Sequence, residues 1–167
     1  MKWIGLILVL VLLSASQATS QVSDDNLIVP GQRIGKWRVE MTIANLVQMN
    51  GRATTIATVN PVDYVLPLPE RHNWNQLGFA AFSRDGQKVD FLLVYSPNFK
   101  TDKGVGPGSD RGAVLNAYGP PTAEIRIAAP GARMVYDAIG FAAGLEGDTM
   151  VGSFVFRPGT GKSLWRF

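Results

Sequence analysis

Hydrophobic residues recur at close to helical spacing in the segment 41–50, which reads MTIANLVQMN. Ile43 and Leu46 share one face of a helix through this segment. Thr42 is a favourable N-cap residue because its hydroxyl accepts hydrogen bonds from free backbone N–H groups, and Gly51 is the residue type that most often ends a helix. The pattern therefore predicts one short amphipathic helix.

Strand-like runs follow this helix. Residues 54–59 are rich in β-branched side chains, and two apolar runs at 77–83 and 88–95 flank Arg84-Asp85-Gly86-Gln87. Asp-Gly between two such runs favours a β-hairpin, because both central positions of the common tight turn need a positive φ. From its second residue onward the second run carries one charge, which predicts a central strand covered on much of both faces.

The helical pattern occurs again in the second half of the chain. Residues 109–118 read SDRGAVLNAY and align with residues 41–50 at a constant offset of 68. Asp110 takes the N-cap position, and Gly119 takes the position of the residue that ends the helix. We therefore expect a second short helix of the same kind.

The strand pattern also recurs. Gly-Phe-Ala-Ala stands at 78–81 and again, unchanged, at 140–143, and the run at 150–156 matches 88–94. The offset here is 62 rather than 68. The difference falls in the proline-rich segment 61–75, which is predicted to be an irregular loop where an insertion is tolerated.

These recurrences predict an α+β fold built from two copies of one unit, a short helical layer with an antiparallel hairpin or three-strand sheet. Repeat 1 spans residues 34–100 and repeat 2 spans 101–160, with an N-terminal arm at 21–33 and a polar tail at 161–167. One copy is too small to bury its own hydrophobic face, so the copies are expected to pack as one domain, as one continuous sheet or as two. A single irregular α+β domain is the alternative.

The first twenty residues have the pattern of a secretory signal peptide. Lys2 gives a positive start, residues 4–13 are apolar, and Ala18 and Ser20 are small residues at the −3 and −1 positions of a cleavage site after Ser20. Cleavage after Ala18 is an alternative. The apolar run is too short to span a bilayer. We therefore expect a protein that is soluble after signal removal, without stable membrane insertion, in the periplasm or outside the cell.

Composition narrows the function classes. The chain contains no cysteine, so it has neither a disulfide nor a lipid-anchor cysteine, and its core must stabilise it. The net charge of +3 is a small excess of 16 basic over 13 acidic residues. No basic cluster with interleaved aromatic residues is present, so the sequence does not favour nucleic-acid binding.

Few residues suggest catalysis. His72, the single histidine, lies in the segment 61–75 with Glu70 as its local carboxylate, and we expect it on the surface. Residues 159–163 (GTGKS) resemble the end of a phosphate-binding loop, but Phe156 stands where that motif needs its first glycine. The sequence therefore predicts no enzyme activity, no metal site and no cofactor.

Two runs carry a resemblance to known families. Residues 34–51 (IGKWRVEMTIANLVQMNG) and 104–121 (GVGPGSDRGAVLNAYGPP) resemble the glycine-x-(Thr/Ser)-helix-Gly-x-Pro signature of the small outer-membrane-assembly proteins SmpA, OmlA or BamE and of the tandem-repeat β-lactamase inhibitor proteins. The resemblance implies a short helical layer against an antiparallel sheet. Glu40 departs from the first family, which usually has glycine there, whereas Gly108 keeps it. No binding residue matches one by one.

Tyr64 and Trp74 lie in the predicted loop 61–75, where we expect them to be exposed anchors for a partner. The function that we expect is an exported, non-catalytic binding or cell-envelope assembly module, which recognises a protein partner through one sheet face and this loop. The alternative is a small-ligand or lipid carrier with an apolar pocket between the repeats.

Overall fold

The computed structural model describes residues 26–65, 67–127 and 130–167. The predicted signal peptide at 1–20 and the start of the predicted arm lie outside these residues. Among the helices within them, none has both the length and the apolar character needed to cross a membrane.

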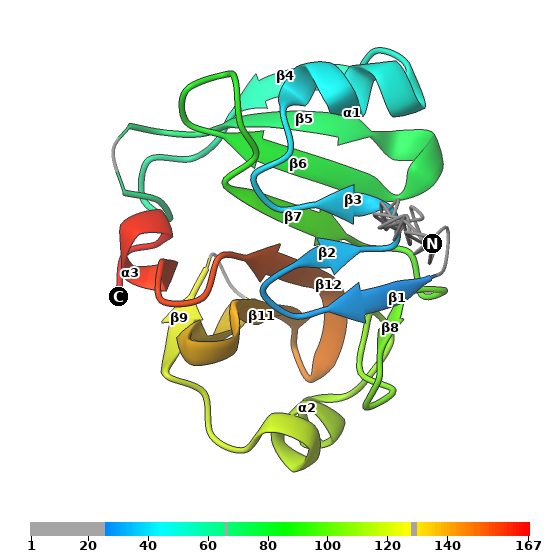
Figure 1. Ribbon diagram of the computed structural model, residues 1–167. Coiled ribbons are helices and arrows are strands. Elements are labelled where there is room, and N and C mark those ends of the chain that lie inside the picture. The colour runs from blue at the N-terminus through cyan, green and yellow to red at the C-terminus, as the bar shows by residue number, and fades with distance from the viewer. Residues whose placement is uncertain (1–25, 66, 128–129) are drawn as a thin grey trace, which may run out of the picture.

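An antiparallel sheet organises the molecule (Figure 1). In the described residues it has eight strands, and each pairing is antiparallel. Their spatial order is β4 (Thr55–Thr58), β5 (Glu70–Trp74), β6 (Phe79–Ser83), β7 (Phe91–Val94), β12 (Thr149–Phe156), β11 (Phe141–Glu146), β10 (Gly131–Tyr136) and β9 (Ala123–Arg126). The first four and the last four strands are therefore two meanders, joined where β7 pairs with β12.

A smaller sheet covers the middle of one face. Its order is β3 (Trp37–Arg38), β2 (Arg33–Ile34), β1 (Leu27–Val29) and β8 (Lys100–Thr101), and β1 pairs with β8 in parallel. Together with the helices, this observation makes the protein an α+β protein, as predicted.

Both predicted helices are confirmed, with their caps. α1 (Ile43–Asn50) begins after Thr42, whose hydroxyl accepts from the Asn45 N–H at 3.1 Å. α2 (Arg111–Tyr118) begins after Asp110, whose carboxylate accepts from the Ala113 N–H at 2.6 Å. Each helix ends at a glycine of positive φ, 76° at residue 51 and 73° at residue 119. A side chain at either glycine would be strained, which is why glycine is favoured there.

The helices lie on the same face of the large sheet, toward its two ends (Figure 1). Leu46 of α1 and Val114 of α2 belong to one buried cluster, with Trp37 of the small sheet and with Phe79 and Phe141 of the large sheet. Amphipathic packing against the sheet, rather than helix propensity, stabilises helices as short as these.

Buried aromatic residues cover the opposite face. The second cluster includes Tyr64, Phe82, Phe91, Phe154, Phe156 and Trp165. The polar tail expected at 161–167 is instead a buried turn: α3 (Gly161–Leu164) leads into Trp165, which is fully buried. The polar sequence GTGKS at 159–163 gives no indication that Trp165 is buried.

The predicted hairpin is confirmed as the β6–β7 pair, and β7 is a central, buried strand as expected. Its connection is longer than a two-residue turn, because residues 84–90 leave the sheet. Asp85 accepts hydrogen bonds from the backbone N–H groups of Gln87 and Lys88, which fixes a side-chain turn, and Lys88 forms a bridge with Thr42.

The segment 61–75 is only partly irregular. The chain forms strand β5 from Glu70 to Trp74, then the 3₁₀ turn η1 (Asn75–Leu77). The corresponding turn in the second half is η2 (Asp137–Ile139), after β10. Each turn ends at a left-handed glycine, Gly78 with φ 59° and Gly140 with φ 67°.

Candidate functional site

A surface cleft of about 360 Å³ lies where the β6–β7 connection, α3 and the turn before α1 meet. Its lining comes from residues 39–40, Pro67, residues in 84–90 and residues in 157–164. Segments distant in sequence therefore converge here, and one of them belongs to the loop that was predicted to contact a partner.

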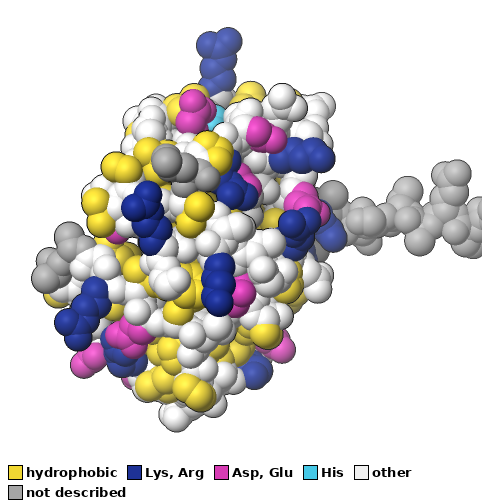
Figure 2. All heavy atoms as spheres, turned by 90° about the vertical axis from the view of Figure 1, so that its left-hand side faces the viewer, with side chains coloured by type: hydrophobic (Ala, Val, Ile, Leu, Met, Phe, Trp, Pro, Cys, Tyr) yellow, Lys and Arg dark blue, Asp and Glu magenta, His cyan; other side chains and the backbone are white. Residues whose placement is uncertain are grey.

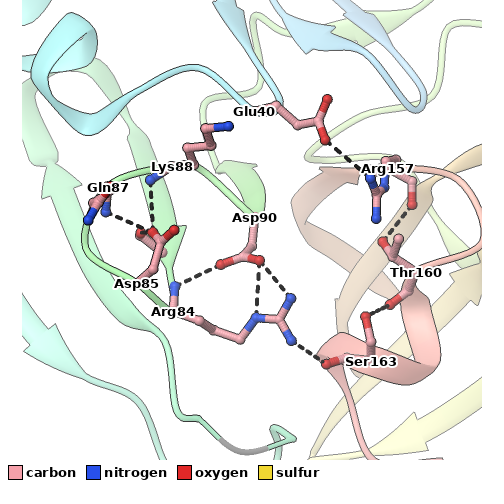
Figure 3. Close-up of polar contacts among 10 residues, drawn as sticks. Glu40, Arg84, Asp85, Gln87, Lys88, Asp90, Arg157, Thr160 and Ser163 are labelled. Carbon is pink, nitrogen blue, oxygen red and sulfur yellow. Dashed lines mark hydrogen bonds and ion pairs between the residues drawn. The ribbon is translucent and has the colours of Figure 1, made fainter.

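An ion pair fixes the floor of the cleft (Figure 3). The Arg84 guanidinium donates to Asp90 Oδ1 from Nε at 3.0 Å and from Nη2 at 2.7 Å, and its Nη1 donates to the Ser163 carbonyl at 2.8 Å. Asp90 Oδ2 also accepts from the Arg84 backbone N–H at 2.7 Å. These bonds hold the β6–β7 connection against α3. The charges of Arg84 and Asp90 are therefore already paired with each other.

The charged side chains on the rim of the cleft are more exposed and more weakly paired. Arg157 Nη1 lies 3.4 Å from Glu40 Oε1, and the two side chains are 65% and 63% exposed. Such an exposed pair adds little to stability. Lys88 extends toward the same carboxylate in Figure 3, and none of the interactions drawn there involves its ammonium group. The rim thus presents two exposed acids, Glu40 and Asp85, and two exposed bases, Lys88 and Arg157, to solvent; the Asp85 carboxylate is already bound to the backbone of its own turn.

Glu40 has a backbone conformation that glutamate disfavours. Its φ is +65°, and it is the one non-glycine residue with positive φ among the described residues. The left-handed conformation costs a residue with a Cβ about 1–2 kcal/mol. The equivalent turn before α2 has Gly108, with φ +89°.

The two turns make the same backbone hydrogen bonds. The Glu40 N–H donates to the Val89 carbonyl at 3.0 Å, as the Gly108 N–H donates to that of Met150 at 2.7 Å. The turn itself therefore does not need a glutamate. The sequence comparison singled out Glu40 as a departure from glycine, but it did not indicate that its carboxylate would lie at a cleft.

Tyr64 and Trp74 are not the exposed anchors that were predicted. They are 6% and 3% exposed, and they lie in different clusters on opposite faces of the sheet. Tyr64 stacks near Phe82 and Phe91, and the Trp74 indole donates to the Gly51 carbonyl at 3.0 Å. The structure therefore does not bring the two residues together.

The prediction that His72 lies on the surface is also wrong. It is 6% exposed because β5 places it beneath the helical layer, paired in register with Ile56 and Ala81. Burial lowers its pKa below the ordinary 6.5, and the Glu70 carboxylate, 3.6 Å away, opposes this shift.

Two further hollows occupy corresponding places in the two halves. One, of about 360 Å³, lies between the end of α1 and η1 and is lined by Trp74 and Leu77. The other, of about 320 Å³, lies between the end of α2 and η2 and is lined by Tyr136 and Ile139. Leu77 and Ile139 are 39% and 37% exposed. Each half thus presents an aliphatic side chain beside a buried aromatic ring.

Two hydroxyl groups line the cleft. Its hydroxyls are those of Thr160 and Ser163, and each donates to a nearby backbone carbonyl. No group of three potential metal ligands occurs in the part of the chain that the structure describes. On the face shown in Figure 2, basic and acidic side chains are interspersed rather than gathered by sign.

Comparison with known proteins identifies no family for this chain. No family model matches the chain, and no match is found among curated proteins. Among solved structures, the chain is similar to an extracellular protein containing an SCP domain from Bacillus anthracis str. Ames, with a TM-score of 0.44 and 14% identity. The match covers 73% of this chain and 45% of that chain, so less than half of the other protein is matched. At this level the similarity supports no conclusion about function.

Proposed function

We propose that the protein is an exported, non-catalytic binding module of the cell envelope that recognises a protein partner at the cleft around Glu40. It acts in the periplasm or outside the cell once residues 1–20 are removed. Pro67, from the loop expected to contact a partner, lines this cleft.

The position of Glu40 is the observation on which the proposal rests. Glycine would adopt this backbone conformation without strain. A strained residue at such a position therefore points to a functional role rather than to a role in stability. Its carboxylate is exposed at the rim, paired only weakly with Arg157. A partner that supplies a cation to Glu40 and a carboxylate to Arg157 and Lys88 would complement this rim.

We also infer that residues 34–100 and 101–160 are copies of one unit, in line with the resemblance to the SmpA/OmlA/BamE and β-lactamase inhibitor families. The elements follow one another in the same order in both halves, from capped helix to four-strand meander. The residues that precede the 3₁₀ turns match closely in conformation, with φ −115° and ψ 77° at Trp74 and φ −113° and ψ 77° at Tyr136.

The carrier alternative requires an enclosed apolar cavity between the halves. At the junction of β7 and β12, Phe91 and Leu92 pair with Phe156 and Val155, and all four side chains are fully buried. The hollows described above open at the surface. These observations favour a partner-binding surface over a carrier.

Affinity capture from an envelope fraction tests the proposal, with the mature wild type, Glu40→Gln and Glu146→Gln as baits. Glu146 is an exposed acid at the far end of β11 and serves as the matched control. We expect a stoichiometric protein with the wild type and the control, and at least tenfold less with Glu40→Gln. Equal recovery by all three would exclude the cleft. Failure to recover any protein, with a small molecule retained in native mass spectrometry, would favour the carrier.

A further inference from the structure

Two arginines occupy corresponding positions on the aromatic face of the large sheet, away from the cleft. Arg71 lies in β5 and Arg133 in β10, at the same offset of 62 that relates the two Gly-Phe-Ala-Ala segments. The Arg71 guanidinium lies 5.7 Å from the ring centroid of Phe82, and that of Arg133 lies 4.6 Å from the ring centroid of Phe154.

Arg133 is a buried cation without a salt-bridge partner in the described residues. It is 4% exposed, and its Nε and Nη1 atoms have no hydrogen-bond partner among the residues that the structure describes. Among the described residues it forms no ion pair with a carboxylate; it faces the rings of Tyr64, Phe154 and Trp165 instead. Burial lowers the pKa of Arg133, Tyr64 and Asp63 oppose this shift, and a guanidinium remains charged at neutral pH. The aromatic rings offset only part of the cost of desolvating this charge.

Arg71 lines an open hollow beside this buried cation. The hollow has a volume of about 260 Å³, lies between β4, β5 and residues 59–64, and is also lined by Tyr64 and Asp63. Arg71 Nε is buried and has no hydrogen-bond partner within 26–65, 67–127 and 130–167. Tyr64 lies against Arg133, with 5.6 Å between the guanidinium carbon and the ring centroid, and it also lines the hollow. Three guanidinium groups and one side-chain carboxylate therefore lie around Tyr64: those of Arg71, Arg133 and Arg166, whose Nε donates to the Tyr64 carbonyl at 2.9 Å, and that of Asp63.

We propose that this hollow binds a small anionic group, a phosphate, sulfate or carboxylate, with Arg71 as its direct ligand and Arg133 supplying a second positive charge from behind Tyr64. Guanidinium groups suit such ligands because their N–H donors match the spacing of oxyanion oxygens. The anion would add a negative charge near Arg133, for which the described part of the chain supplies the field of Asp63 but no salt bridge. This site is independent of the cleft around Glu40.

Thermal unfolding of the mature chain in increasing inorganic phosphate tests the site, with sodium chloride at equal ionic strength as the reference. General salt effects on stability rise without saturating, whereas binding to the native state gives a Tm increase that saturates. We expect a saturating increase in the wild type and in Arg126→Met, an exposed arginine of the neighbouring strand β9. We expect its loss in Arg71→Met and Arg133→Met.

Arg133→Met also tests, in the absence of any ligand, whether the charge of Arg133 is uncompensated. Replacing an uncompensated buried charge by an apolar side chain of similar length should leave Tm unchanged or raise it in phosphate-free buffer. A large fall in Tm, or failure of this variant to fold, would show that the chain already compensates the charge and would overturn the proposal. A saturating phosphate effect that survives in Arg71→Met would overturn it as well.

A second titration identifies the source of the anion. Glycerol phosphate carries the same anionic group on a larger molecule. If the Tm increase saturates at a lower concentration of glycerol phosphate than of inorganic phosphate, the natural ligand is a larger molecule that carries the anionic group. If it saturates at the same concentration of both, the ligand is the free anion. Absence of saturation with both compounds would exclude the site.

Discussion

The indole N–H of Trp74 donates a hydrogen bond to the carbonyl oxygen of Gly51, and the two atoms are 3.0 Å apart. In the second half of the chain the Tyr136 hydroxyl donates to the Gly119 carbonyl, also at 3.0 Å. In each half the last residue of a strand therefore holds the glycine that ends a helix. Because a helix end leaves carbonyl groups without partners, these bonds couple the helical layer to the sheet.

Removing the Tyr136 hydroxyl tests this coupling. Tyr136→Phe keeps the ring in place and deletes the bond to Gly119, so we expect the free energy of unfolding to fall by about 1 kcal/mol. Tyr95→Phe is the control, because its hydroxyl makes only a long, exposed contact of 3.5 Å with Asn75. Urea unfolding measures both variants. Equal effects would contradict a specific role for the Tyr136 hydroxyl.

Glu40→Gly should stabilise the protein by about 1 kcal/mol, because glycine adopts a positive φ without strain. Glu40→Ala removes the same carboxylate but keeps a Cβ, so it should not gain this stability. The difference between the two midpoints of urea unfolding isolates the backbone effect. Were Glu40→Gly less stable than Glu40→Ala, the strain at this turn would be disproved.

The buried imidazole of His72 should make stability depend on pH. Burial lowers its pKa in the folded protein below the 6.5 of an exposed histidine, so the unfolded chain binds the proton more tightly. The contribution of neutral His72 is therefore complete above pH 6.5 and is lost as the pH falls from 6.5 toward the lower folded pKa.

Two measurements check this dependence. An NMR titration follows the single imidazole in the folded protein directly, and a pKa at or above 6.5 would refute the prediction. Urea unfolding about one pH unit above and below 6.5 should show a smaller loss of stability in His72→Gln than in the wild type. That variant retains the carboxylates, so it controls for their titration.

The C-terminal residues should be essential for stability. Trp165 is fully buried and lies 5.1 Å from the Arg133 guanidinium carbon and 4.8 Å from the Phe156 ring. Trp165→Ala should lower the free energy of unfolding by about 3–5 kcal/mol, because it leaves a large cavity. Phe167→Ala, at a side chain 44% exposed, should change it by less than about 0.5 kcal/mol. Similar effects of both substitutions would contradict a specific role of Trp165.

The features that the sequence predicted well are those with local causes. Thr42 and Asp110 cap their helices through their own side chains, and Gly51 and Gly119 end them through their own conformational freedom. The apolar character of β7 similarly predicted a central strand. The helix caps and the helix ends depend on no distant partner, whereas the central place of β7 also requires β12, and its apolar sequence indicated only that it would be covered.

The features that were missed depend on tertiary contacts. Strand β5 reads Glu-Arg-His-Asn-Trp, which has no alternation of apolar and polar residues. The side-chain amide of the buried Asn73 finds its hydrogen-bond acceptor on the neighbouring strand, where Thr55 Oγ1 lies 3.0 Å from Nδ2. The burial of Trp165 likewise requires the Tyr64 segment, with which it forms a bridge. The cleft could not be predicted either, since it forms where four segments that are distant in sequence meet.

In the described residues, the halves of the large sheet join through one strand pair, in which Phe91–Val94 meet Ser153–Phe156. Within each half, strands pair with neighbours in sequence, which closes short loops, whereas this joint closes a long one and should form late in folding. During synthesis, β7 would therefore have an open edge until β12 has emerged. An unpaired edge of four buried-type residues is a template for association, so the nascent chain is most vulnerable to pairing with another molecule there.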